Sequence, residues 1–292
     1  MREAHIHPPS DRYPEEVRRG AGFVDAHVHC KDTCCLDAVV DAGVVAVRDA
    51  GMTGNTIRGI CAIDRDSSLP LIISARWALY KKGGYGSSFG IPVETPEEMK
   101  SAIHLLKNAG AGIIKIMASG IVSFKEPGRV TAGGFNKDEL QFIVQAAATC
   151  GLDVMAHVNG EQAIIDVAEA GVRSIEHGFF MSERALRIMA KKSTFWVPTV
   201  GALKRAAESG NVSKESEDFV AGLIRSHLEM MLYAQGIGVP LAVGTDCVLP
   251  DSRYRETYDA ELAYFEQAGI PYDDVRKIAC EGGARLLGIK AS

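Results

Sequence analysis

The chain has 292 residues, of which 47% are hydrophobic and 24% are charged, a composition typical of a globular protein with a substantial core. A formal net charge of -5 and scattered Lys and Arg residues argue against a nucleic-acid partner. No stretch has the apolar length needed to span a bilayer, and the polar residues Met1–Ser10 do not resemble a signal peptide. We therefore expect a cytoplasmic protein with a small-molecule substrate and no membrane partner; assembly into a homo-oligomer stays open.

Short apolar segments alternate with amphipathic ones along most of the chain, after a polar N-terminal tail at residues 1–21. The apolar segments are rich in Val, Ile and Ala and are bounded by Gly or Pro, as buried parallel strands are. We predict eight strands, over Gly22–His29, Val44–Ala50, Leu69–Ala75, Gly112–Ala118, Leu152–Val158, Val172–His177, Thr194–Pro198 and Pro240–Thr245.

The amphipathic segments predict helices over Pro96–Asn108, Asn136–Cys150, Glu161–Ala170, Glu183–Lys191 and Phe219–Gln235. Thr95 and Asn136 are N-cap residues with a glutamate three positions later, which is the capping-box pattern. Glycines are expected just after the last turns of four of these helices, at Gly110, Gly151, Gly171 and Gly236.

Eight strands with intervening helices predict an α/β fold, a (β/α)8 TIM barrel over residues 22–292. A doubly wound open sheet is the alternative. It is disfavoured because no Gly-x-Gly-x-x-Gly motif follows the first strand.

Side chains that bind metals stand at the ends of several predicted strands. The two-residue period of a strand puts His27 and His29 on one face. His157, His177 and Asp246 end the fifth, sixth and eighth strands. Because catalytic groups of such barrels lie at the carboxyl ends of the strands, and because neutral imidazole and carboxylate suit a zinc-like ion, the sequence predicts a catalytic metal site.

The fourth strand carries Lys115 inside the apolar segment Ile113–Met117. Burial lowers the pKa of a lysine, which makes its neutral amine available as a nucleophile or base. Such an amine can also react with carbon dioxide to form a carbamate, and this anionic oxygen ligand could bridge two metal ions.

Other histidines and the cysteines provide weaker signals. His5 and His7 repeat the spacing of the first-strand pair, but no apolar segment precedes them, so we interpret them as incidental. His104 and His227 fall within helical patterns and are expected to be surface or packing residues. The seven cysteines form an odd set without Cys-x-x-Cys spacing, which disfavours disulfides and a thiolate zinc site.

Taken together, the motifs resemble the amidohydrolase superfamily, specifically its prolidase-like or Xaa-Pro dipeptidase-like branch, which includes imidazolonepropionase-related amidohydrolases. The resemblance runs almost end to end, and it is carried by Gly22–His29, Val47–Asp49, Ile114–Gly120, Ala156–Gly160, Ser174–Gly178, Val197–Thr199 and Gly244–Asp246. It implies that His27, His29 and Asp246 hold one metal ion, that His157 and His177 hold a second, and that carboxylated Lys115 bridges them. Zinc is the usual metal.

The resemblance also implies a reaction, the cleavage of an amide in dipeptides or N-acyl amino acids. Asp246 would take a proton from the attacking water and deliver it to the leaving amine, and His177 would lie near the carbonyl. Some relatives open lactones or cleave esters. A mononuclear deaminase or chlorohydrolase is the main competitor, but such enzymes usually lack the strand-four lysine and carry a glutamate at the position of Gly160. A catalytically inactive binding barrel is a third possibility.

Two features depart from the pattern of the branch. The flanks of the barrel are too short for the usual small β-sandwich domain, so we expect a version with the barrel alone. Tyr85, in the segment Gly83–Gly86, stands where many relatives have a histidine. Its hydroxyl could bind a carboxylate or carbonyl group of the substrate.

Overall fold

The computed structural model describes residues 22–31, 36–54, 70–209 and 213–289. The predicted tail at residues 1–21, with His5 and His7, lies outside these ranges, as does Leu69 at the start of the predicted third strand. Cys30, Cys150, Cys247 and Cys280 are free thiols, and the other three cysteines are outside the described residues. Among the described helices, none combines the length and apolarity required to traverse a lipid bilayer.

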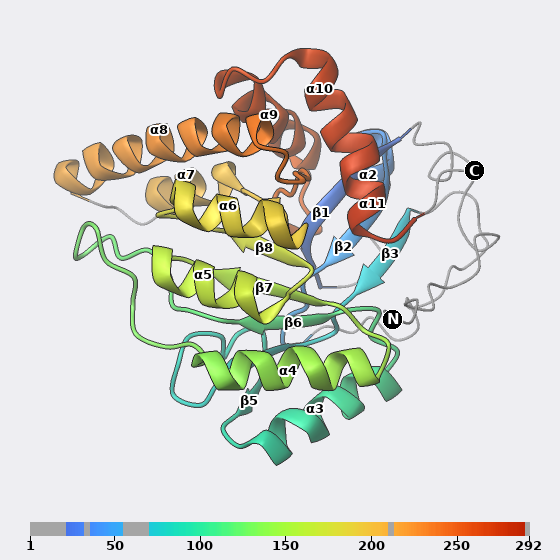
Figure 1. Cartoon of the computed structure of the whole chain (residues 1–292). Coiled ribbons are helices and arrows are strands. Elements are labelled where there is room, and N and C mark those ends of the chain that lie inside the picture. The colour runs from blue at the N-terminus through green and yellow to red at the C-terminus, as the bar shows by residue number, and fades with distance from the viewer. Residues whose placement is uncertain (1–21, 32–35, 55–69, 210–212, 290–292) are drawn as a thin grey trace.

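All the described strand pairs are parallel, and the strands form two sheets (Figure 1). The first sheet has the order β10 (Cys247–Leu249), β1 (Phe23–Cys30), β2 (Val44–Asp49) and β3 (Leu71–Ser74). The second has the order β5 (Gly90–Val93), β4 (Ala78–Lys81), β6 (Ile114–Met117), β7 (Val154–Val158), β8 (Ser174–His177) and β9 (Phe195–Val197).

Backbone hydrogen bonds join the two sheets into a ring. The N–H of Gly112 donates to the carbonyl of Ser74 over 2.9 Å, which connects the segment before β6 to β3. On the opposite side, Trp196 N–H donates to the carbonyl of Pro240 over 2.9 Å, and Ala26 N–H donates to that of Val243 over 2.8 Å. Residues 240–243 therefore lie between β9 and β1, and the predicted α/β barrel is confirmed.

The eighth strand is less regular than predicted. Within Pro240–Thr245 only Leu241 forms a bridge, to Trp196, and the regular strand β10 begins at Cys247. Gly244 packs so closely against β9 and β1 that an added Cβ would lie 2.8 Å from the Cβ of His27. Asp246 then adopts a φ of 52°, in the left-handed region, and this interrupts the strand.

Helices cover the outside of the barrel (Figure 1), and their bounds largely follow the predictions. They are α2 (Asp37–Asp41), α3 (Pro96–Asn108), α4 (Lys137–Thr149), α5 (Glu161–Ala170), α6 (Glu183–Lys192), α7 (Val200–Ser209), α8 (Lys214–Gly236), α9 (Tyr254–Gln267), α10 (Tyr272–Lys277), the π-helix η2 (Ile278–Gly282) and α11 (Gly283–Leu286). The strands β4 and β5 and the helices α2, α7, α9, α10, η2 and α11 were not predicted.

The predicted helix caps and terminal glycines agree with the structure at most positions. Thr95 and Asn136 both form the predicted capping boxes. Positive φ angles follow α3, α4 and α5 at Gly110, Gly151 and Gly171. Helix α8 differs from its prediction at both ends. It begins five residues early, because Ser213 caps it, and it continues through Gly236, so that Gly238 takes the positive φ of 79° instead.

Candidate active site

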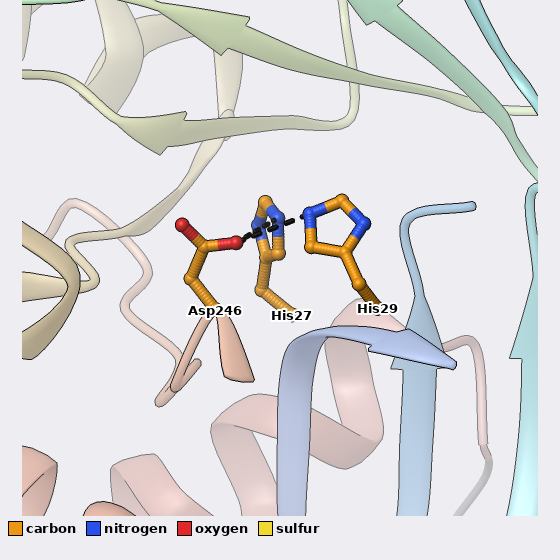
Figure 2. Close-up of side chains that lie close together, drawn as sticks. All are labelled: His27, His29 and Asp246. Atoms are coloured by element: carbon orange, nitrogen blue, oxygen red, sulfur yellow. Dashed lines mark ion pairs between the residues drawn. The ribbon is translucent and has the colours of Figure 1, made fainter. Parts of the chain in front are cut away.

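Four histidines and one aspartate meet at the carboxyl ends of the barrel strands. The ring centroids of His27 and His29 are 5.4 Å apart, those of His27 and His177 are 5.1 Å apart, and those of His157 and His177 are 4.6 Å apart. Asp246 Oδ1 lies 3.3 Å from Nε2 of His27 and 3.1 Å from Nε2 of His29. Figure 2 shows the Asp246 carboxylate directed toward the two rings. The structure thus brings together the strand-end residues that the sequence singled out.

One nitrogen of each β1 histidine is held by a fixed acceptor. Nδ1 of His29 donates to the carbonyl of Gly51 over 2.7 Å, and Nδ1 of His27 donates to Glu176 Oε2 over 2.7 Å. These bonds set the tautomer of each ring, so that both Nε2 atoms carry a lone pair toward Asp246. Nε2 of His27 is buried and has no hydrogen-bond partner among the described residues.

The other two histidines are held in the same way. Nε2 of His157 donates to the carbonyl of Gly120 over 3.1 Å, and Nδ1 of His177 lies 2.7 Å from the hydroxyl of Thr199. The second ring nitrogen, Nδ1 in His157 and Nε2 in His177, does not take part in these two hydrogen bonds. Metal-ligating histidines are oriented by second partners of this kind.

Burial keeps three of these imidazoles uncharged. Together with the nearby Lys115 ammonium, it lowers the pKa of His27 to about 4 and that of His157 to about 3. The pKa of His177 is also well below its usual value, because of burial and its neighbour His157. Neutral imidazoles and an ionised carboxylate are the protonation states that metal ligands need.

These residues fit a divalent metal ion. Ligand atoms of His27, His29 and Asp246 all lie within 4.8 Å of one another. The unpartnered Nε2 of His27 is the second observation, since a buried imidazole nitrogen without a partner is costly unless something binds it. Nitrogen and oxygen donors in this combination are those that zinc accepts.

Lys115, on β6, is 1% exposed and lines the same cavity as His157, His177 and Asp246. Burial lowers its pKa to about 8, although Glu176 and Asp246 act in the opposite direction. Its amine is therefore easier to deprotonate than that of a surface lysine. The sequence predicted this environment, a lysine directed into the barrel rather than toward solvent.

A buried polar layer beneath the histidines was not recognised from the sequence. Arg48 is 1% exposed, and its guanidinium donates to Glu176 Oε1 and to the hydroxyl of Ser174, both over 2.8 Å, and to the carbonyl of Ala26 over 2.7 Å. Burial would raise the pKa of Glu176, but Arg48 and His27 hold it at about 2. The signal was present as a charged residue that follows four apolar residues of a predicted strand.

Asp25 is a second buried acid whose role was not predicted. Its carboxylate accepts hydrogen bonds from the backbone of His27 and Thr245, from the Thr245 hydroxyl over 2.7 Å, and from the Tyr254 hydroxyl over 2.9 Å. It therefore ties β1 to the eighth strand and to α9, next to Asp246. Burial raises its pKa to about 6.

Tyr85 lines the cavity and packs against two neighbouring rings. Its ring centroid lies 5.2 Å from that of His157 and 5.9 Å from that of Phe89. Burial, together with Asp246, raises its pKa to about 12, so its hydroxyl stays a hydrogen-bond donor at neutral pH. His227, in contrast, is buried between Trp196 and Phe179 and is the packing residue that was expected, whereas His104 is exposed on α3.

Comparisons with known proteins identify the family of the chain and several similar proteins. The model of the amidohydrolase family matches residues 21–292. Ochratoxinase of Aspergillus niger is 30% identical over 204 residues, which cover 61% of this chain and 42% of that protein, so the match spans less than half of its length. A prolidase complexed with N-methylphosphonate-L-proline has a TM-score of 0.76 and 25% identity, over 93% of this chain and 75% of that one. A Xaa-Pro dipeptidase with bound methionine has a TM-score of 0.77 and 24% identity, over 92% and 75% respectively.

Proposed function

Because the chain belongs to the amidohydrolase family, we propose that it is a metal-dependent hydrolase that cleaves a peptide-like or N-acyl amino acid amide bond at a binuclear site. The observation that carries the proposal is the set of four buried imidazoles, each held at one nitrogen, gathered around Asp246. The names of the similar proteins, ochratoxinase, prolidase and Xaa-Pro dipeptidase, support this class of reaction.

The metal ligands divide into two groups in this proposal. His27, His29 and Asp246 would hold one ion, and His157 and His177 would hold the other, with zinc as the metal. Lys115 would join the two groups as a carbamate, formed when its neutral amine adds carbon dioxide and releases a proton. When bound, the two ions would lower the pKa of water and polarise the scissile carbonyl.

Proton transfer is the task of Asp246. Its carboxylate would accept a proton from the attacking water, and would then deliver that proton to the leaving nitrogen, so that water and an amide yield an acid and an amine. His177 lies beside it, with Nδ1 3.9 Å from Asp246 Oδ2, and would contact the carbonyl. Tyr85 would donate its hydroxyl to a carbonyl or carboxylate oxygen of the substrate.

A site with a single metal ion is the second candidate, and one observation favours it. Among the described residues, His27, His29 and Asp246 are the one group of three ligands whose atoms all lie within 4.8 Å of each other. Lys115 distinguishes the two candidates, because a carbamate bridge is needed only between two ions.

Metal analysis combined with hydrolysis of dipeptides, N-acyl amino acids, esters and lactones tests the proposal. We expect about two zinc ions per chain, and a fall in kcat of about 10²–10⁴-fold for Asp246→Asn, which keeps the shape but removes the base. Lys115→Ala should reduce the metal content, whereas His104→Gln, an exposed histidine on α3, should change neither quantity. Full activity in Asp246→Asn would refute its role, and one ion per fully active chain would favour the mononuclear site.

A further inference from the structure

The cavity at the proposed metal site is lined by both polar and apolar side chains. It measures about 200 Å³, and its polar lining includes Lys115, His157, His177 and Asp246. Two of its phenylalanine rings lie beside candidate ligands, with the Phe89 centroid 4.9 Å from that of His29 and the Phe179 centroid 6.4 Å from that of His177. A molecule bound next to the candidate ligands therefore also meets apolar walls.

Two elements that follow strand ends build the apolar part. The first is the segment after β6, where Val122 pairs with Val130 and the neighbouring Ile121 is 40% exposed. The second is α7, whose residues Ala202, Leu203 and Ala206 face the cavity. Val122, Phe179 and Leu203 belong to one hydrophobic cluster, so the two elements support each other. Ile121 lines the cavity, and an apolar group bound there would cover its exposed surface.

The charge of the walls limits what can enter the apolar part. Among the described residues that line the cavity there is no arginine, and the one lysine is Lys115, which belongs to the proposed metal site. A carboxylate placed against the phenylalanine rings would lose its hydration and find no cation there. The free-energy cost of burying an unpaired charge is large.

The volume of the cavity limits the size of the apolar group. An apolar protein cavity of about 150 Å³ is large enough to bind benzene. A cavity of about 200 Å³ therefore holds one aromatic ring, or a branched alkyl group of similar size, together with a scissile group.

We infer that this enzyme acts on amides whose scissile bond is next to an uncharged, apolar group about the size of one aromatic ring, and that Ala202, Leu203 and Ala206 of α7 select that group by size. The inference rests on the proposed function for the reaction itself. The binding preference does not depend on turnover, and it is measurable on its own.

Three carboxylic acids that share one head group test the preference on the purified full chain. Calorimetry with phenylacetate, acetate and succinate compares a ring, no tail and a charged tail. We expect phenylacetate to bind about tenfold or more tightly than acetate, from the apolar area that the ring buries, and succinate to bind no more tightly than acetate.

Variants of α7 test whether this helix is the source of the preference for phenylacetate. Ala202→Phe should lower the ratio of phenylacetate to acetate affinity by about tenfold, because the new side chain occupies the apolar part. Ala206→Leu, at a more exposed position, tests the same wall if the first variant folds poorly. Ala148→Phe, on the exposed side of α4, is the matched control and should leave the ratio unchanged.

The outcomes separate this inference from the proposed function. If succinate binds as tightly as phenylacetate, if phenylacetate shows no advantage or no binding, or if both α7 variants keep the wild-type ratio, the inference is wrong. If phenylacetate is preferred but no amide is hydrolysed, the apolar subsite stands and the proposed reaction is wrong.

Discussion

Substitution of Arg48 tests how much the buried ion pair with Glu176 stabilises the barrel beneath the candidate site. The Arg48→Met substitution keeps most of the side-chain volume but removes the guanidinium that pairs with Glu176 over 2.8 Å. Both side chains are fully enclosed, with 1% and 0% exposure, so the remaining carboxylate would be a buried charge with its main partner gone. Removing one member of such a pair costs about 3–5 kcal/mol.

This magnitude is large enough to measure by thermal unfolding. For a chain of this size, each kcal/mol corresponds to a change in Tm of about 2 °C, so Arg48→Met should lower Tm by about 6–10 °C. Adding Glu176→Gln removes the unpaired charge, and the double variant should therefore be more stable than the sum of the two single changes predicts, by about 1–3 kcal/mol. The metal content should also fall, because Glu176 orients His27.

A surface pair supplies the control for this experiment. Arg187 and Glu183 form an ion pair on α6 with side chains 60% and 51% exposed, and Arg187→Met should lower Tm by no more than about 2 °C. A similarly small shift for Arg48→Met, or strict additivity with Glu176→Gln, would refute the conclusion that the buried pair holds a charge in place.

Two further predictions concern the histidines. In metal-free protein, the free energy of unfolding should fall as the pH is lowered from about 6.5 toward 4, because the unfolded chain takes up protons near 6.5 while burial holds the pKa of His157 at about 3. Urea titrations at several pH values give the free energy of unfolding of the wild type and of His157→Gln. The difference between the two proteins isolates the contribution of His157 from that of Asp25, which acts in the opposite direction. If the free energies of the two proteins change with pH in parallel, the prediction is wrong. Thr199→Val removes the hydroxyl 2.7 Å from Nδ1 of His177 and should weaken metal affinity about 10–100-fold in a chelator competition. The exposed Thr149→Val is its control, and equal affinities in the two variants would refute the role of Thr199.

The strand ends could be predicted because two local rules act together there. The two-residue period of a strand fixes which side chains share a face, and the barrel brings the carboxyl ends of parallel strands to one side. His27, His29 and His157 follow from these rules without any knowledge of tertiary contacts. His177 does not, because its neighbour Glu176 already points inward and His177 joins the site only through a left-handed φ of 64°. The capping boxes at Thr95 and Asn136 are equally local, and α3 and α4 begin where they were expected.

Helix α7 shows why other elements could not be predicted. Its first two N–H groups, those of Val200 and Gly201, donate over 2.7 and 2.9 Å to Glu261, a buried residue of α9. The acceptor that caps this helix is therefore 60 residues away in sequence, so no local pattern marks the start of the helix. The preceding Thr199 adopts a φ of 48°, which only the packed structure imposes.

The polar layer was missed for a related reason. The sequence displays Arg48 and Glu176 inside predicted strands, but nothing in either segment indicates that they pair across 128 residues. Strand period explains why both point inward. Their partnership depends on the closed ring that places β2 and β8 on the same barrel interior.

The hydrogen bonds of Asp25 determine when the site can first exist during synthesis of the chain. Thr245 follows Asp25 by 220 residues and Tyr254 follows it by 229, so the first strand leaves the ribosome long before its partners do. At about 5–20 residues per second, that interval lasts roughly 10–40 s. Throughout it, Asp246 has not yet been made, so His27 and His29 cannot form the three-residue candidate metal site until the segment that carries Asp246 has been translated.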